Sequence, residues 1–233
     1  MQASAIVRDT SAVTGAIQLA AVQSGVDFGY LCAQAKLESG LNPEAKAATS
    51  SARGLYQFTA STWLDTVRRH GADYGLAAAA AALQHGASAA TRAEILDLRH
   101  NPQVAAQMAG ALAADNRTHL EAGLGRPAIA TDLYMAHFLG AAGALRFLRA
   151  HAADPSASGA ALVPAAAHAN HAVFFRSDGT PRSLAAIYDG FAAKLGGTAL
   201  PISGNNLPVR IAALPTAPQS ARLAYLQLAE ISI

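Results

Sequence analysis

The sequence has few of the residues on which several common classes of protein depend. Of its 233 residues, one is cysteine, 6% are aromatic and 14% are charged. A single cysteine allows neither an internal disulfide nor a cysteine-based zinc site, so we interpret Cys32 as a small core residue. No stretch approaches the roughly 18 to 20 apolar residues that a membrane-spanning helix requires. The sequence therefore predicts neither a disulfide framework nor an integral membrane segment.

Positive and negative charges nearly balance in the sequence. The formal net charge is +2, and the Lys and Arg residues form no cluster of the kind that binds nucleic acid, so we expect no nucleic-acid partner. The first 25 residues lack a basic start followed by an unbroken apolar segment, because Arg8, Asp9 and Gln18 interrupt the apolar residues. They do not resemble a signal peptide.

What the sequence does contain is alanine and helical spacing, which predict an all-α fold. Residues 11–24 place Val13, Ile17, Ala20 and Ala21 on one face, and Gly25 follows as a stop. A second helix, capped by Asp27, has an inner face of Phe28, Leu31, Cys32 and Ala35. Glu38 falls in the last turn of this helix.

Residues 39–59 show no sustained period and are too many for an ordinary helix connection, which predicts a functional loop. A helix capped by Ser61 follows, and others are expected at 91–98, 102–122, 127–138, 140–151, 164–174 and 183–194, with a connection at 155–164. We expect one helical domain over residues 1–195. Residues 196–233, rich in Pro and Gly, are expected to form a flexible tail with a short terminal helix that docks on the domain or on a partner.

Two motifs flank the long loop: Glu38-Ser39-Gly40-Leu41-Asn42-Pro43 and Gly54-Leu55-Tyr56-Gln57-Phe58-Thr59. Together they resemble the two hallmarks of the lytic transglycosylases (SLT domain, similar to glycoside hydrolase family 23) of the goose-type lysozyme superfamily. In that family Glu-Ser-Gly/Ala-x-x-Pro is followed, after a loop, by Gly-Leu-Met-Gln, a hydrophobic residue and Thr. The resemblance implies a lysozyme-like helical domain with a long active-site loop.

Glu38 fits the chemistry without the family name. Cleavage of a glycosidic bond requires a proton for a poor leaving group, which a carboxyl group can supply if apolar neighbours favour its protonated form. Ordinary glycosidases add a second carboxylate. The nearest candidates, Glu44, Asp65, Asp73 and Asp132, stand in no motif, and a solvated or helix-capping role suits each better.

The resemblance implies that one carboxylate suffices. In that family the N-acetyl group of the sugar stabilises the positive charge at the anomeric carbon, and the C6 hydroxyl of the same sugar attacks in place of water. It also implies substrate-binding roles for Ser39, Tyr56 and Gln57. Tyr56 replaces the family's Met and would form an apolar wall for a sugar. A third family motif, Ala-Tyr-Asn-Ala-Gly, is matched at Ala136 and Gly140 alone, with His137 in place of the Tyr. We expect His137 to line the cleft, a structural histidine being the alternative.

The sequence thus predicts a peptidoglycan lytic transglycosylase that needs no metal or cofactor. His168 and His171 could share a helical face, but no carboxylate accompanies them to complete a metal site. A goose-type muramidase that uses water and a non-catalytic peptidoglycan-binding or assembly component are the alternatives. We expect the protein to act in the periplasm or cell envelope, reached without a recognisable leader, or to be a phage lysin. The tail could contact a secretion, flagellar or phage assembly partner.

Overall fold

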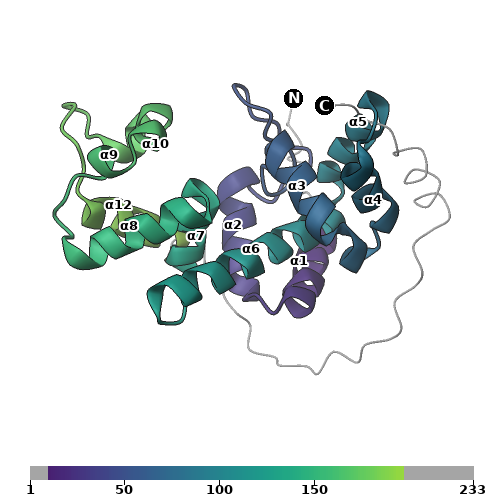
Figure 1. Cartoon of the computed structure of the whole chain (residues 1–233), viewed down its shortest axis with the longest axis horizontal. Coiled ribbons are helices and arrows are strands. Elements are labelled where there is room, and N and C mark those ends of the chain that lie inside the picture. The colour runs from purple at the N-terminus through teal and green to yellow at the C-terminus, as the bar shows by residue number, and fades with distance from the viewer. Residues whose placement is uncertain (1–9, 197–233) are drawn as a thin grey trace, which may run out of the picture. The chain divides into compact units, whose positions relative to one another are not determined.

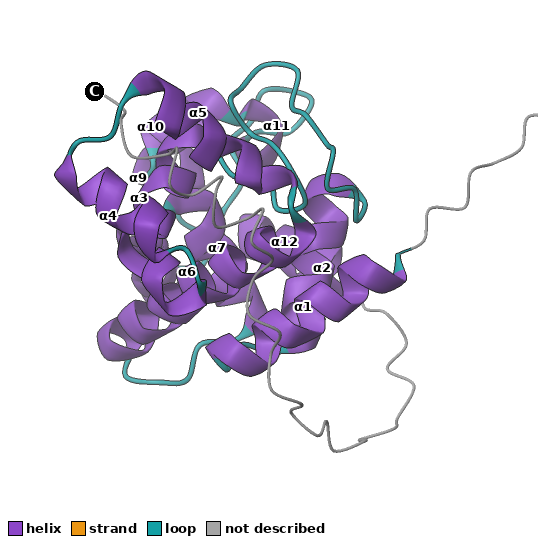
Figure 2. Ribbon diagram, turned by 90° about the vertical axis from the view of Figure 1, so that its right-hand side faces the viewer, coloured by secondary structure: helices purple, strands orange, loops and turns teal. Residues whose placement is uncertain are grey.

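The computed structural model describes residues 10–196, and within them the regular elements are helices, with isolated β-bridges and loops between them (Figures 1 and 2). This confirms the predicted all-α fold. The expected tail with its terminal helix lies outside the described residues. None of the helices in residues 10–196 is both long and apolar enough to cross a membrane.

The described chain divides into two compact units, residues 10–111 and residues 112–196, and helix α6 (Pro102–Leu124) runs from the first into the second. The single domain expected over residues 1–195 stays a prediction. The first unit contains α1 (Ser11–Ser24), α2 (Phe28–Ser39), α3 (Ala60–His70), η1 (Gly71–Tyr74), α4 (Ala77–His85), α5 (Ala89–Asp97) and η2 (Leu98–His100).

The core of the first unit forms where α1 packs on α2 and where α3 packs on α4 and α5. The first helix begins and ends where the apolar spacing predicts, and Val13, Ile17, Ala20 and Ala21 are its buried residues. Trp63 on α3 is fully buried, and its indole nitrogen donates to the Ile95 carbonyl oxygen at 2.6 Å. These contacts fix the helices that flank the long loop.

The second unit contains α7 (Ala130–Leu139), α8 (Ala141–Ala153), α9 (Gly159–Leu162), α10 (Pro164–Ala169), α11 (His171–Phe174) and α12 (Leu184–Gly196). Helix α12 packs on α7 and α8. Phe138, Phe174 and Phe191 form an aromatic cluster whose neighbouring ring centroids lie 5.1 and 6.2 Å apart. A pocket of about 250 Å³ lies beside α12, lined by residues that include Arg182, Ile187 and Lys194.

Several details of the predicted helices were wrong. Thr59 caps α3 in place of Ser61, because its hydroxyl accepts from the Thr62 backbone N–H. The stretch from 155 to 164, expected as a connection, contains α9. The helix expected over 164–174 is broken at Asn170, whose side-chain amide donates to the Ala166 carbonyl oxygen and so competes with the helical backbone bonds.

A buried carboxylate organises the second unit. Asp132 is 0% exposed and accepts hydrogen bonds from Arg126 at 2.6 Å, from the Tyr188 hydroxyl at 2.9 Å and from the Ile129 backbone N–H at 3.0 Å. It therefore ties the start of α7 to α12. Burial, followed by the charge of Asp132 and its hydrogen bond, raises the pKa of Tyr188 to about 12.

Tyr188→Phe should destabilise the protein by about 1 to 2 kcal/mol, because it removes a hydrogen bond to a charged acceptor. Since the pKa of Tyr188 is raised from its ordinary value of 10 to about 12 in the folded state, its contribution is complete below pH 10 and is lost as the pH rises toward 12. Urea unfolding at several alkaline pH values should show a steeper loss of stability in the wild type than in Tyr188→Phe. Equal slopes would contradict this account.

Candidate active site

Glu38 lies in the last turn of α2, as predicted, and its side chain is half-buried. The helix begins at a side-chain cap, where Asp27 accepts from the Tyr30 N–H at 2.8 Å. It ends at Gly40, whose φ of 61° is left-handed and whose N–H donates to the carbonyl oxygens of Ala35 and Lys36. A capped helix end fixes the backbone that carries Glu38, at the point where the chain turns into the loop.

Ser39 joins the two sequence motifs. Its hydroxyl lies 2.7 Å from the Leu55 carbonyl oxygen and 3.1 Å from that of Ala35, and it accepts from the Asn42 N–H at 3.1 Å. The hydroxyl of Ser39 thus bonds the end of α2 and holds the second motif beside the helix end that carries Glu38. A direct contact of Ser39 with substrate stays a prediction.

The loop folds back on itself between α2 and α3 (Figure 1). Isolated bridges pair Arg53 with Lys46 and with Phe58, and the Gly54 N–H donates to the Ala45 carbonyl oxygen at 2.8 Å. Leu55, Tyr56 and Phe58 are buried, and the Phe58 ring packs edge-on against Trp63. Burial of these three side chains anchors the second motif in the core of the first unit.

Gln57 is a half-buried residue that the turn holds in a strained conformation. Its φ of 48° is left-handed, which costs a non-glycine residue about 1 to 2 kcal/mol. The amide nitrogen donates to the carbonyl oxygens of Ala45 at 3.2 Å and Gly54 at 2.9 Å, and the amide oxygen accepts no hydrogen bond from the described residues. Its oxygen is therefore available to accept from a substrate N–H or O–H, while the nitrogen stabilises the loop.

The sequence led us to expect that Tyr56 presents a ring face to a sugar, but the structure buries this ring. The side chain is 1% exposed, because it lies between Leu55 and Phe58 in a segment that packs into the core. Its hydroxyl has no partner among the described residues. Burial, with smaller effects of Cys32 and Tyr30, raises the pKa of Tyr56 well above its usual value, so the phenol is neutral and cannot act as a base.

His137 belongs to α7 in the second unit, where it is half-buried and its ring centroid lies 5.9 Å from that of Tyr134. Its place in the cleft stays a prediction.

Cys32 is a buried core residue of α2, as expected. Burial, followed by the charge of Asp27, raises the pKa of its thiol to about 11. The thiol therefore stays protonated near neutral pH.

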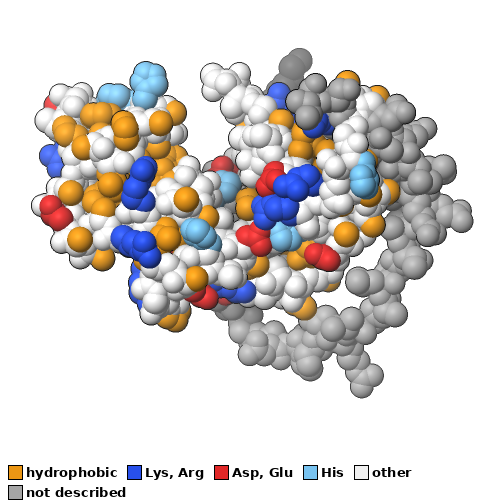
Figure 3. Space-filling model, viewed as in Figure 1, with side chains coloured by type: hydrophobic (Ala, Val, Ile, Leu, Met, Phe, Trp, Pro, Cys, Tyr) orange, Lys and Arg blue, Asp and Glu red, His pale blue; other side chains and the backbone are white. Residues whose placement is uncertain are grey.

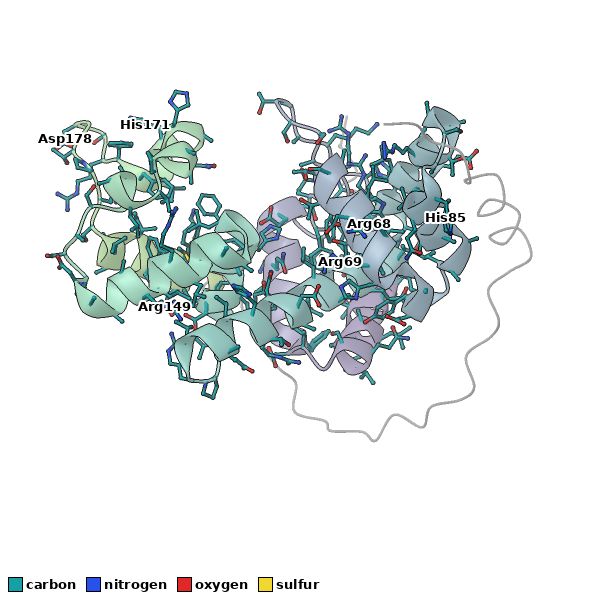
Figure 4. All side chains as sticks on the ribbon, in the orientation of Figure 1. Arg68, Arg69, His85, Arg149, His171 and Asp178 are labelled. Atoms are coloured by element: carbon teal, nitrogen blue, oxygen red, sulfur yellow. The ribbon has the colours of Figure 1, made fainter. Side chains whose placement is uncertain are left out.

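The three residues of the first unit that the sequence offered as a second carboxylate lie at the surface. Glu44 is 70% exposed and lies 3.3 Å from His100, and Asp73 is exposed. Asp65 pairs with Arg68 at 2.6 Å and Arg69 at 2.9 Å on the exposed side of α3 (Figure 4). Burial acts to raise the pKa of Asp65, but hydrogen bonds from the two arginines lower it below its ordinary value. Figure 3 shows acidic and basic side chains interspersed on the visible face.

Two arginines that the sequence did not single out hold the loop. Nη1 of Arg53 lies within hydrogen-bond distance of the carbonyl oxygens of Ala47, Ser50 and Ala52, at 3.4, 3.1 and 2.8 Å. Arg99 reaches the loop from η2. Arg53 stands between the two motifs, and its position there was the available signal; Arg99 stands in no motif.

Gly54→Ala should destabilise the protein by about 3 kcal/mol or more, and Gly40→Ala by about 1 to 2 kcal/mol. Both glycines have left-handed φ values, but a Cβ at Gly54 would lie 2.0 Å from the Arg99 carbonyl oxygen, whereas one at Gly40 meets nothing within 4 Å. Gly40→Ala is thus a matched control for backbone strain alone. Equal losses in urea unfolding would show that the loop and η2 are not in close contact.

Tyr56→Phe should leave the stability unchanged or raise it by up to about 1 kcal/mol, because it removes a buried hydroxyl without a partner and keeps the ring. Thermal unfolding of the two proteins measures the difference. A loss above about 1 kcal/mol would mean that the hydroxyl makes a hydrogen bond in the folded protein.

The comparison with known protein families agrees with the geometry of this unit. Residues 15–112 match the family model of the transglycosylase SLT domain, a stretch that runs from within α1 into α6 and includes Glu38 and the whole loop. The resemblance first seen in two short motifs therefore extends over nearly all of the first unit. Over residues 15–112 the chain is thus similar to the transglycosylase SLT domain, and this match supports a lytic transglycosylase of the lysozyme-like superfamily.

Proposed function

We propose that the protein is a lytic transglycosylase that cleaves the β-1,4 linkage between N-acetylmuramic acid and N-acetylglucosamine in peptidoglycan. The observation that carries the proposal is the place of Glu38: it is half-buried at the capped end of α2, and the adjacent Ser39 is bonded to the second family motif through Leu55. A carboxyl group carried on this fixed helix end, beside a loop with a free amide oxygen, suits proton transfer to a bound glycan.

In the proposed reaction, the Glu38 carboxyl group donates its proton to the bridging oxygen as the bond to the anomeric carbon breaks. The N-acetyl oxygen of the same muramic acid stabilises the positive charge at that carbon. Glu38, now a carboxylate, then takes the proton of the C6 hydroxyl as its oxygen bonds to the anomeric carbon. The products are a 1,6-anhydro-N-acetylmuramic acid end and a free 4-hydroxyl group, with no water consumed and Glu38 protonated again.

Gln57 supports binding in this proposal. Its amide nitrogen is committed to the carbonyl oxygens of Ala45 and Gly54, which leaves the oxygen to accept from an N-acetyl N–H or a sugar hydroxyl. Ser39 acts by holding the loop, and the substrate-binding role expected for His137 stays a prediction. We further propose that the protein acts at the cell envelope, where its substrate lies. A partner contacted by the tail is a prediction for residues outside the described range.

Glu38→Gln should lower the release of soluble fragments from purified sacculi by about 100-fold or more, because it removes the acid and base but keeps the size of the side chain. Glu44→Gln is the matched control: it changes an exposed carboxylate of the same loop and should leave the release unchanged. Circular dichroism should show the same helical content in all three proteins. Equal release by wild type and Glu38→Gln would contradict the catalytic role.

Mass spectrometry of the fragments distinguishes the proposed reaction from hydrolysis. Anhydro ends are lighter than the reducing ends of a muramidase by the mass of one water. Reducing ends that depend on Glu38 would favour the muramidase, which requires an acidic residue opposite Glu38. Sacculus binding without fragments from the wild type would favour the non-catalytic component.

A further inference from the structure

The short helix η2 contacts the site loop near its beginning, at its middle and at its end. The Nδ1 atom of His100 lies 3.1 Å from the Pro43 carbonyl oxygen. Nη1 of Arg99 lies 2.8 Å from the Ser51 carbonyl oxygen and 3.2 Å from that of Phe58. A three-residue element thus touches a loop that precedes it by about forty or more positions in the sequence.

Arg99 is the centre of this contact. Its side chain is buried, the residue being 8% exposed, and Nε donates to the Leu96 carbonyl oxygen at 2.8 Å. It forms no ion pair with a carboxylate among the described residues, so its guanidinium is solvated by three backbone carbonyl oxygens. Burial, followed by the charge of Arg53, lowers the pKa of Arg99, while Asp97 acts to raise it. A guanidinium retains its charge after such a shift because its ordinary pKa lies far above neutral pH.

The backbone of Arg99 is as closely fitted as its side chain. Its carbonyl oxygen occupies the space where a Cβ at Gly54 would stand, and Gly54 opens the turn that carries Leu55 and Gln57. The side chain holds the loop on either side of this turn, at Ser51 and at Phe58. Between these points lies the Leu55 carbonyl oxygen that Ser39 bonds.

We infer that Arg99 is a positioning residue of the active site. It fixes the turn of residues 54–57 against η2. This turn then fixes the Gln57 amide, and it fixes the Leu55 carbonyl oxygen that Ser39 bonds next to Glu38. The effect of Arg99 on catalysis rests on the proposed function; its effect on the loop does not.

The planar fork of arginine explains why this position requires it. Nε and Nη1 point in fixed directions from one rigid plane, and here they bond carbonyl oxygens from two segments, at Leu96 and at Ser51 and Phe58. A lysine carries one ammonium on a flexible stem and cannot reproduce both directions. Arg99→Lys therefore keeps the charge and loses the geometry.

The test compares wild type, Arg99→Lys and a control, Arg68→Lys, which makes the same change in an exposed ion pair on α3. Amide hydrogen exchange of residues 45–58 is measured first. In Arg99→Lys the Arg53 and Gly54 N–H groups, which donate to Phe58 and Ala45, should exchange about tenfold faster or more, while α1 exchanges as in the wild type. Arg68→Lys should change neither.

Kinetics with soluble glycan strands then separates positioning from stability. Arg99→Lys should raise KM about threefold or more, which a smaller folded fraction would not do, because that fraction lowers only the apparent kcat. Unchanged loop exchange, equally faster exchange in α1, or an unchanged KM would overturn the inference. If the wild type releases no fragments, the proposed function fails, and hydrogen exchange alone decides whether Arg99 fixes the loop.

Discussion

The site depends on how an irregular loop satisfies its backbone carbonyl oxygens. Residues 40–59 form neither helix nor sheet, so side chains must supply much of the hydrogen bonding that secondary structure provides elsewhere. Ser39, Arg53, Gln57 and Arg99 supply it, and each donates to carbonyl oxygens in or at the edge of the loop. The same bonds bring the second motif to the helix end that carries Glu38. The loop is thus a preorganised part of the site.

This arrangement explains why the two motifs occur together. The first places Glu38 at a helix end and supplies Ser39, and the second supplies Leu55, whose carbonyl oxygen Ser39 bonds. The apolar residues of the second motif are buried, so their contribution is to fix the backbone of Gln57 in its left-handed conformation.

Local patterns predicted the parts of the fold that local forces determine. The bounds and inner face of α1, and the place of Glu38 at the end of α2, follow from apolar spacing and from the glycines that stop the helices. Arg99 could not be predicted, because its partners in the loop lie 41 and 48 residues away and no motif surrounds it. The burial of Tyr56 was missed because an aromatic residue in a motif that also contains Leu55 and Phe58 suits a cleft wall and a core equally well.

The central claim is that glycan binds where α2 ends and the loop returns. Amide chemical shifts of the labelled protein, followed as a soluble N-acetylglucosamine tetramer is added, test it most directly. The account predicts the largest changes within residues 38–58, at Gln57 above all, in wild type and in Glu38→Gln alike. Changes confined to the second unit, for example around the pocket beside α12, with residues 38–58 unaffected, would contradict it.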